Sequence, residues 1–375
     1  MALKVQNFQR LQRLLLLYRQ PLADLSPGRG GASALKSRCL SSSPSPSSSS
    51  SSPASLSYRD GSFNHCKPLD GNGGSRCSRD YHRYAYMPLR QLPVLVPVEQ
   101  RRSFKRDLFL KATSDHAALQ YLQNEYEGVA VISLNRSEAR NAIGAEMLKQ
   151  LHSIVQGLRH GTSARVLIVC STVPGVFCAG ADLKERQKMG FSETEKFVSS
   201  LRSTFSDLEE LQIPTIAVIE GAALGGGLEL ALACDLRVCG EEAVFGLPET
   251  SLAIIPGAGG TQRLPRVIGR SRAKELIFTA DRVNAKRAEA LGLVDHCVAE
   301  GEAYTKALSI AQKILDRGPL AVKIAKHAID HGIEMDPTKG MLFEEACYSR
   351  LLRSSDRLEG LAAFAEKRKP FYRGE

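Results

Sequence analysis

The sequence predicts an α/β fold, because short apolar runs alternate along the chain with segments of helical periodicity. Apolar runs at residues 129–134, 165–170 and 215–219 predict strands, and amphipathic segments lie between them. A further short strand is expected at residues 235–239, after an apolar helix. Strands that alternate with helices in this way favour parallel pairing through crossover connections.

The helices between these strands have recognisable inward faces. One helix is expected over residues 144–160, and its apolar residues recur every three or four positions: Met147, Leu151, Ile154, Val155 and Leu158. The sequence Ser-Glu-Thr-Glu at residues 192–195 fits a capping box, so a second helix is predicted to begin there and to end at Pro214. Its inward residues would be Phe197, Val198, Leu201, Phe205, Leu208 and Leu211.

The formal net charge of +10 belongs to the first part of the chain. Residues 1–110 contain 17 Lys and Arg against 6 Asp and Glu, which leaves 33 (50 − 17) basic and 34 (40 − 6) acidic residues elsewhere. Residues 1–20 are amphipathic and Arg-rich, and no acidic residue precedes Asp24, which is typical of an organelle transit peptide. A disordered basic tail is the alternative. Residues 41–58 are almost entirely Ser and Pro and cannot build a core.

Three parts are therefore expected in the chain. Residues 1–115 would be a transit peptide and low-complexity linker, largely disordered, residues 116–300 a catalytic core, and residues 301–375 a C-terminal helical region. In the last part, Gly318 and Gly332 are expected to end helices. No stretch approaches 18 apolar residues, so no membrane span is expected.

The nine cysteines are an odd number, and those after the leader are scattered singly. They are Cys170, Cys178, Cys234, Cys239, Cys297 and Cys347. This spacing matches neither a disulfide framework nor a metal site, so we expect reduced, mostly buried thiols and no bound metal.

Residues 217–260 are the stretch around which the chain is organised. A triple glycine at residues 225–227 lies between the strand at 215–219 and a helix that begins near Gly225. The first N–H groups of a helix have no internal acceptor, and glycine lets a ligand approach the backbone. This turn predicts an anion or oxyanion site, and tight helix–strand packing is the alternative. A second glycine turn, at residues 257–260, lacks the Gly-Lys-Ser/Thr of a P-loop and is expected to support the pocket.

Two carboxylates accompany these glycines. Glu229 lies in the first turn of the apolar helix, so it is expected to be at least partly buried, with a raised pKa or hydrogen-bond partners. The alternative is a glutamate that only stabilises the helix dipole. Glu249 lies twenty positions later, and a helix followed by a returning strand could bring it back to the same place. Two carboxylates beside an oxyanion site suit paired acid–base chemistry.

Taken together, the motifs resemble the crotonase, or enoyl-CoA hydratase/isomerase, superfamily over about residues 122–375. The matching segments, in order, are residues 135–142, 177–184, 223–229, 246–249 and 256–264. Within this superfamily the chain is most similar to the mitochondrial methylglutaconyl-CoA hydratase branch, which includes an AU-rich-RNA-binding relative. That closer similarity is carried by residues 178–186, 222–235, 252–266, 273–278, 344–348 and 356–361.

The resemblance implies a fold and a set of binding residues. The fold would be a spiral of ββα repeats with a C-terminal helical trimerisation region. Ala181 and Gly226 match the two oxyanion-hole residues, whose backbone N–H groups would hold the thioester oxygen of an acyl-CoA. Ala181, Asp182, Leu183 and Lys184 match the CoA-binding loop, and Lys184 could meet a phosphate.

The resemblance also implies the chemistry. Glu229 and Glu249 match the two family carboxylates, of which Glu229 would deprotonate water for attack at C3 and Glu249 would protonate C2. Two acids favour a hydratase over an isomerase. The expected reaction converts 3-methylglutaconyl-CoA to 3-hydroxy-3-methylglutaryl-CoA in leucine degradation, with no metal or other cofactor, because CoA is part of the substrate. A homotrimer or a dimer of trimers in the mitochondrial matrix is expected, with plastid and peroxisome as alternative locations.

Two other functions are compatible with parts of the sequence. The first is a general short-chain enoyl-CoA hydratase of fatty acid β-oxidation, because sequence does not show the shape of the acyl pocket. The second is RNA binding, which in the RNA-binding relative uses a row of lysines along the first core helix. Here that helix offers only Lys149, Arg159 and His160, and the core is nearly neutral, so RNA binding is not expected.

Overall fold

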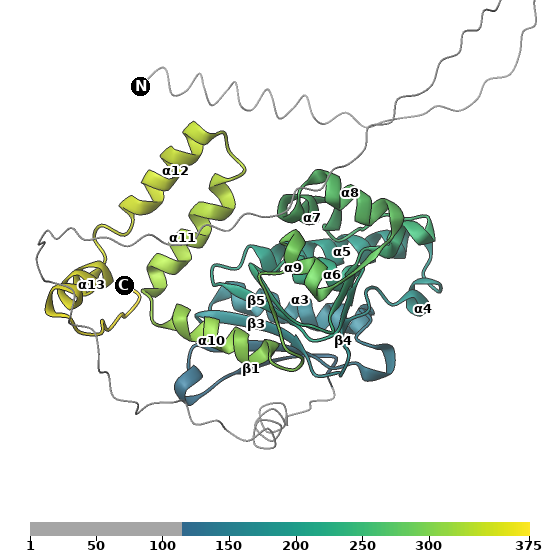
Figure 1. The fold of residues 1–375 in the computed structure, drawn as a ribbon, viewed down its shortest axis with the longest axis horizontal. Coiled ribbons are helices and arrows are strands. Elements are labelled where there is room, and N and C mark those ends of the chain that lie inside the picture. Colours follow the sequence, from purple (N-terminus) through teal and green to yellow (C-terminus); the bar gives the residue numbers. More distant parts are fainter. Residues whose placement is uncertain (1–114) are drawn as a thin grey trace, which may run out of the picture. The chain divides into compact units, whose positions relative to one another are not determined.

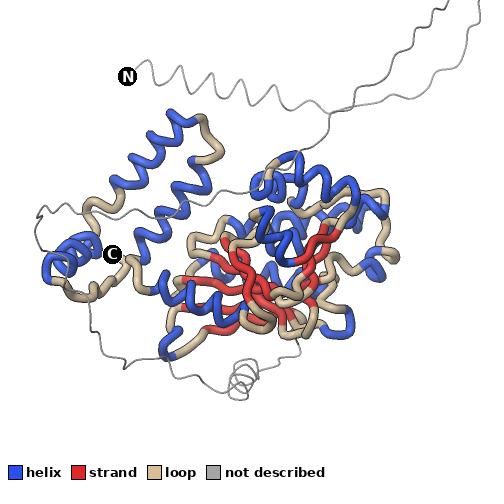
Figure 2. The backbone as a smooth tube through the Cα atoms, in the orientation of Figure 1, coloured by secondary structure: helices blue, strands red, loops and turns tan. Residues whose placement is uncertain are grey.

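The structure is a computed structural model, and it describes residues 115–375 (Figure 1). The leader predicted at residues 1–115 lies outside the described residues except for its last position. The described chain is an α/β structure with parallel strands, as predicted, and Figure 2 shows the strands gathered between helices. No helix in residues 115–375 is long and apolar enough to cross a membrane.

A large sheet of six strands runs in the order β1-β2-β3-β5-β7-β10. Its strands are β1 (Ala117–Tyr121), β2 (Val129–Leu134), β3 (Val166–Ser171), β5 (Thr215–Ile219), β7 (Leu236–Gly240) and β10 (His296–Val298). The first pair is antiparallel and all other pairs are parallel. β2 and β5 have the predicted bounds, whereas β3 and β7 begin and end one residue later than predicted.

A small second sheet runs in the order β4-β6-β8-β9. Its strands are β4 (Val176–Cys178), β6 (Ala222–Leu224), β8 (Val244–Gly246) and β9 (Arg282–Asn284). The first three pair in parallel, and each follows directly on a strand of the large sheet. Helical segments come next: α4 (Leu183–Arg186) and α5 (Phe191–Glu209), then α6 (Gly226–Leu232), then the 3-10 turn η3 (Pro248–Leu252). This repeat is the predicted ββα spiral, and it brings the carboxyl ends of β4, β6 and β8 to one edge.

The main core is formed by the small sheet, one face of the large sheet and the helices packed on it. Phe177 of β4, Phe205 of α5 and Phe245 of β8 are fully buried there. The inward face predicted for α3 (Ala145–His160) is confirmed, although Ile154 is only partly buried. The predicted capping box is wrong, because α5 begins earlier, with Gly190 as its N-cap and no capping side chain.

The opposite face of the large sheet is covered by α10 (Ala303–Leu315). Ala303, Tyr304 and Ala307 of this helix belong to the same buried cluster as Val166 and Ile168 of β3. The central strands are therefore buried on both sides, which explains why they are continuously apolar in sequence. Although α10 lies in the predicted C-terminal region, its packing joins it to the sheet.

The remaining elements complete the described chain. They are η1 (Asn124–Tyr126), η2 (Ser137–Ala139), α7 (Gly260–Ile268), α8 (Arg270–Thr279), α9 (Ala285–Leu291), α11 (Pro319–Gly332), α12 (Pro337–Ser349) and α13 (Ser355–Glu366). Gly332 is the last residue of α11, but Gly318 precedes that helix as its N-cap and does not end α10, so its predicted role is wrong. The six cysteines of the described chain are free thiols, and all but Cys297 are buried, as predicted.

Candidate active site

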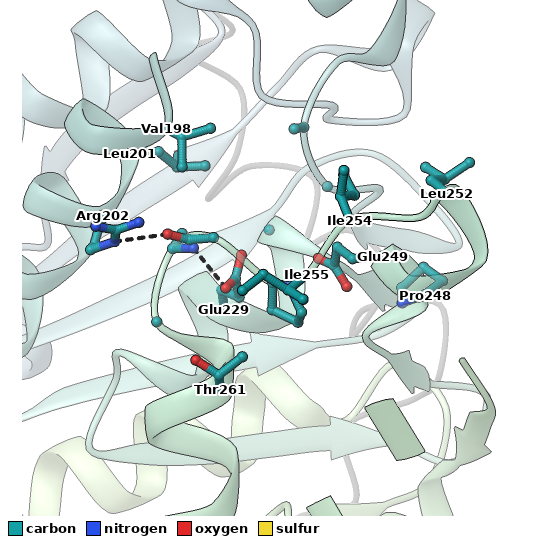
Figure 3. A pocket seen from close by; sticks show the side chains of 18 of the residues that line it. Val198, Leu201, Arg202, Glu229, Pro248, Glu249, Leu252, Ile254, Ile255 and Thr261 are labelled. Atoms are coloured by element: carbon teal, nitrogen blue, oxygen red, sulfur yellow. Dashed lines mark hydrogen bonds between the residues drawn. The ribbon is translucent and has the colours of Figure 1, made fainter. Parts of the chain in front are cut away.

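A cavity of about 770 Å³ opens at the edge where β4, β6 and β8 end. Backbone and side chains from both glycine turns line it, together with apolar residues of α5 such as Val198 and Leu201 (Figure 3). Ala181, Gly226 and Glu229 all lie on its wall, and so does Glu249. The spiral therefore brings together four predicted site residues that are up to 68 positions apart (249 − 181) in the sequence.

The two predicted oxyanion-hole residues lie next to each other because β4 and β6 pair in parallel. A Cβ built on Gly226 would lie 3.5 Å from the backbone nitrogen of Ala181. Gly226 is the first residue of α6, so its N–H has no acceptor within that helix. The turn itself needs glycine at Gly225, whose φ is +51° and whose Cβ would lie 3.0 Å from Oε1 of Glu249.

Glu229 is held firmly on one side of its carboxylate. Its side chain is buried, with 2% of the residue exposed, and its Oε1 accepts hydrogen bonds from the backbone N–H groups of Ala258 and Gly260, both at 2.8 Å. Burial raises its pKa, and these two N–H groups and the charges of Arg263 and Arg202 oppose the rise. The second glycine turn thus supports the pocket, as predicted, by orienting this acid and favouring its ionised form.

Glu249 lies in the first turn of η3 on the same cavity. Burial and the nearby charge of Glu229 raise its pKa to about 7, while the charge of Arg186 acts in the opposite direction. Its Oε2 is buried and has no hydrogen-bond partner among the described residues. A carboxyl group with these properties holds a proton near neutral pH and has an oxygen available to transfer it.

The cavity therefore combines two carboxyl groups of different character with two closely spaced backbone N–H groups. Glu229 has two N–H partners that favour its anion, whereas Glu249 feels the charge of Glu229 and has an oxygen, Oε2, without a hydrogen-bond partner in residues 115–375. Environments that separate the pKa values of two acids in this way assign one as the base and the other as the acid. The adjacent N–H groups can stabilise an oxyanion in the same space.

Comparison with known proteins agrees with this geometry. The sequence profile described as "Enoyl-CoA hydratase/isomerase" matches residues 124–375. The chain belongs to this family. Its similarity to individual members is high: it is 59% identical over 256 residues to "Probable enoyl-CoA hydratase 2, mitochondrial" of Arabidopsis thaliana, covering 68% of this chain and 85% of that protein. It is 50% identical over 267 residues to "Methylglutaconyl-CoA hydratase, mitochondrial" of Homo sapiens, covering 70% of this chain and 79% of that protein.

Solved structures of this family have the same fold. The crystal structure of enoyl-CoA hydratase from Bacillus anthracis aligns with a TM-score of 0.67 at 46% identity, covering 70% of this chain and all of that one. The predicted family, the spiral fold and the enzyme class of enoyl-CoA hydratases are therefore confirmed.

Of the predicted CoA-binding residues of this enoyl-CoA hydratase, some line the cavity and others do not. Leu183 lines the cavity with Ala181, but Asp182 and Lys184 are not among the described residues that line it. Oδ1 of Asp182 accepts the backbone N–H groups of Lys184 and Glu185, and its Oδ2 lies 2.9 Å from Nη2 of Arg136. Its side chain therefore caps α4, whereas the side chain of Lys184 is exposed.

Two arginines of the site were missed by sequence reasoning. Arg186 and Arg202 both line the cavity, on α4 and α5. Arg202 follows Val198 by four positions, so the two side chains share a helix face, and an arginine on an otherwise apolar inward face was a usable signal. Arg186 had no such signal, because its helix is only four residues long.

Proposed function

We propose that this protein hydrates the C2–C3 double bond of 3-methylglutaconyl-CoA and so forms 3-hydroxy-3-methylglutaryl-CoA. The observation that carries the hydratase mechanism is the pair Glu229 and Glu249, which share one cavity and differ in their partners: two backbone N–H groups bind Glu229, whereas Oε2 of Glu249 has no hydrogen-bond partner in residues 115–375. The choice of substrate is supported by the similarity to relatives named methylglutaconyl-CoA hydratase. This reaction belongs to leucine degradation, and the relatives' names place it in mitochondria, which agrees with the matrix location expected from the leader.

The proposed reaction balances without an electron carrier. The thioester oxygen accepts hydrogen bonds from the N–H groups of Ala181 and Gly226, which stabilise the charge that develops on it as the double bond is attacked. Glu229 takes a proton from a water molecule while the hydroxide adds to C3. Glu249 gives its proton to C2, and the two acids are then reset by moving one proton from Glu229 back to Glu249. No oxidation state changes overall, so we propose no metal, flavin or nicotinamide.

The CoA moiety would be held by the segment that follows the first oxyanion donor. Leu183 lies on the cavity wall, and the exposed ammonium group of Lys184 forms no ion pair within residues 115–375, so it is available to a phosphate. Asp182 would act indirectly, by fixing α4 and with it the backbone of this segment. These residues therefore remain our proposed CoA-binding set together with Ala181 and Gly226.

A homotrimer or a dimer of trimers is proposed as the assembly. The C-terminal helices expose large apolar side chains, such as Met341 and Leu342 on α12 and Phe364 on α13, which is 86% exposed. Such faces need a partner surface to be covered. Light scattering on the purified full-length chain tests this, and a monomer at micromolar concentration would contradict it.

The substrate is tested by steady-state kinetics of the full-length enzyme with 3-methylglutaconyl-CoA and crotonyl-CoA. We expect kcat/KM to be higher for 3-methylglutaconyl-CoA by roughly tenfold or more, as a charged contact to the substrate would provide. An equal or higher value for crotonyl-CoA would favour the second candidate, a general short-chain enoyl-CoA hydratase. That candidate is supported by the mostly apolar lining of the cavity, including Leu201, Leu252 and Ile254.

RNA binding is not proposed. Among the basic residues of α3, Arg159 pairs with Asp207 and Glu210, so its charge is neutralised within the protein. Lys149 is exposed but stands far from Arg159 along the helix, ten positions away (159 − 149). A salt-dependent shift in the gel mobility of AU-rich RNA on addition of the protein would contradict this conclusion.

A further inference from the structure

Arg202 reaches the active-site cavity from α5. Its Nε donates a hydrogen bond of 2.9 Å to the carbonyl oxygen of Gly257. The next residue, Ala258, donates its N–H to Glu229, so one short loop connects the guanidinium and the catalytic carboxylate. Figure 3 shows Arg202 and Glu229 on either side of this loop, with both hydrogen bonds drawn as dashed lines.

This contact orients the guanidinium of Arg202 but leaves most of its N–H donors unoccupied. Nε uses one of its five N–H donors, and no acceptor for the four on Nη1 and Nη2 is found in residues 115–375. Arg263, beside the same loop, is the contrasting case. Its donors are taken by Glu209, Ser206 and the carbonyl oxygen of Ala258, and its side chain is buried. Arg263 therefore supports the loop, whereas Arg202 keeps a free planar donor edge.

The proposed substrate needs such a donor edge close to C3. Its second carboxylate lies only two bonds beyond C3, the atom to which water adds, so this carboxylate must enter the same space as Glu229 and Glu249. Glu229 is buried, and repulsion between a substrate carboxylate and an ionised glutamate costs more where water is excluded. A positive charge beside Glu229 offsets this repulsion, and a guanidinium can bind a carboxylate through two parallel hydrogen bonds.

We propose that Arg202 binds the distal carboxylate of the substrate and is the residue that selects dicarboxylic enoyl-CoA thioesters over simple ones. This inference rests on the proposed function, because it adds a specificity determinant to the same reaction. The bond from Nε to Gly257 holds the guanidinium against the loop, and Arg202 lines the cavity there. An enoyl thioester without a second carboxylate would leave this charged edge without a partner.

Among the described residues, Arg186 is the other cationic residue on the cavity wall, and its position suits a different task. It lies on α4, in the segment that follows Ala181, and its charge acts on Glu249. Because the carbonyl is held at Ala181, this segment faces the CoA side of the thioester. Replacing Arg186 is therefore the matched control for replacing Arg202, because it removes a positive charge from the same cavity at a different place.

The test compares Arg202→Gln, Arg202→Lys and Arg186→Gln with the wild-type full-length enzyme. For each, kcat/KM is measured with 3-methylglutaconyl-CoA and with crotonyl-CoA, and the ratio of the two values is the readout. Inhibition constants of glutaryl-CoA and butyryl-CoA, which differ by one carboxylate and do not react, give the same comparison for binding alone. Circular dichroism confirms that each variant is folded.

We expect Arg202→Gln to lower the ratio by roughly 10- to 100-fold, the effect of losing a charged hydrogen-bond pair. In the same variant, the preference of the enzyme for glutaryl-CoA over butyryl-CoA as inhibitor should fall by a similar factor. Arg202→Lys should keep part of the substrate preference and part of the inhibitor preference, because the charge remains. Arg186→Gln should affect the two substrates alike.

Three results would overturn the inference. If the Arg202→Gln ratio stays within about threefold of wild type while the wild type prefers 3-methylglutaconyl-CoA, the proposed substrate stands and Arg202 is not its determinant. If Arg186→Gln changes the ratio instead, the carboxylate lies at Arg186. If the wild type itself prefers crotonyl-CoA, the proposed substrate fails, and the inference fails with it.

Discussion

Replacing Glu249 with glutamine removes the proton that the proposed mechanism delivers to C2 while it keeps the size and shape of the side chain. A glutamine cannot donate this proton, so kcat should fall by roughly 10²- to 10⁴-fold. In the wild-type enzyme, kcat/KM for hydration should also decline above about pH 7, because the pKa of Glu249 is about 7 and its proton is lost there. The assay is the loss of the enoyl-thioester absorbance over a pH series.

The same substitution should change the pH dependence of stability. Because burial raises the pKa of Glu249 from 4.5 to about 7, the group contributes stability that is complete below pH 4.5 and is lost as the pH rises through about 7. The full rise corresponds to at most about 3 kcal/mol, and partial exposure of the carboxyl reduces this to roughly 1–2 kcal/mol. Glutamine does not ionise, so between about pH 5 and pH 8 the variant should gain this amount relative to wild type in urea unfolding.

A matched control is Glu242→Gln, which changes an exposed glutamate just before β8 and should alter neither kcat nor the pH dependence. If a folded Glu249→Gln enzyme keeps more than about a third of the wild-type kcat, Glu249 is not the proton donor. If its stability follows pH as the wild type does, the buried environment assigned to Glu249 is wrong.

Three further predictions concern other parts of the site. Glu229→Gln should lower kcat by roughly 10²- to 10⁴-fold with the melting temperature nearly unchanged, and unimpaired turnover would refute its role as the base. Gly227→Ala should destabilise the fold by about 1–3 kcal/mol in urea unfolding, because its Cβ would overlap the backbone where β4 ends. The control Gly157→Ala, whose Cβ meets open space within α3, should stabilise the fold by roughly 0.5–1 kcal/mol. Equal effects of the two variants would contradict the close packing of Gly227 on β4. Asp182→Asn should cost about 1–3 kcal/mol at neutral pH, because it weakens the α4 cap and the ion pair with Arg136. Burial acts to raise the pKa of Asp182, but these partners hold it below its usual 3.8. The stability that the Asp182 carboxylate contributes should therefore be present above pH 3.8 and lost as the pH falls further. A stability difference between variant and wild type that does not change with pH would argue against this role.

The sequence alone determined the central strands and the two carboxylates and glycine turns of the candidate site, but not its arginines Arg186 and Arg202. The apolar runs predicted β2, β3, β5 and β7 of the large sheet to within one residue, because strands buried on both faces leave a continuous signal, whereas its two edge strands β1 and β10 were not predicted. The glycines at 225–227 and the lone carboxylate of Glu229 were visible because a backbone without Cβ and a charge in an apolar helix are local departures from pattern. The cap of α5 was misjudged, because Gly190 begins the helix without a side-chain signal.

Only the tertiary structure decided how these residues act on one another. The pKa of Glu249 depends on burial and on the charge of Glu229, which reaches it only because the spiral brings Gly225, the N-cap of α6, against the Glu249 carboxyl group. Arg202 meets Gly257 across 55 positions of sequence, so neither residue alone indicates the contact. Electrostatic interactions depend on distance in space and on the exclusion of water, and both are set by the packing of elements that are remote in the chain.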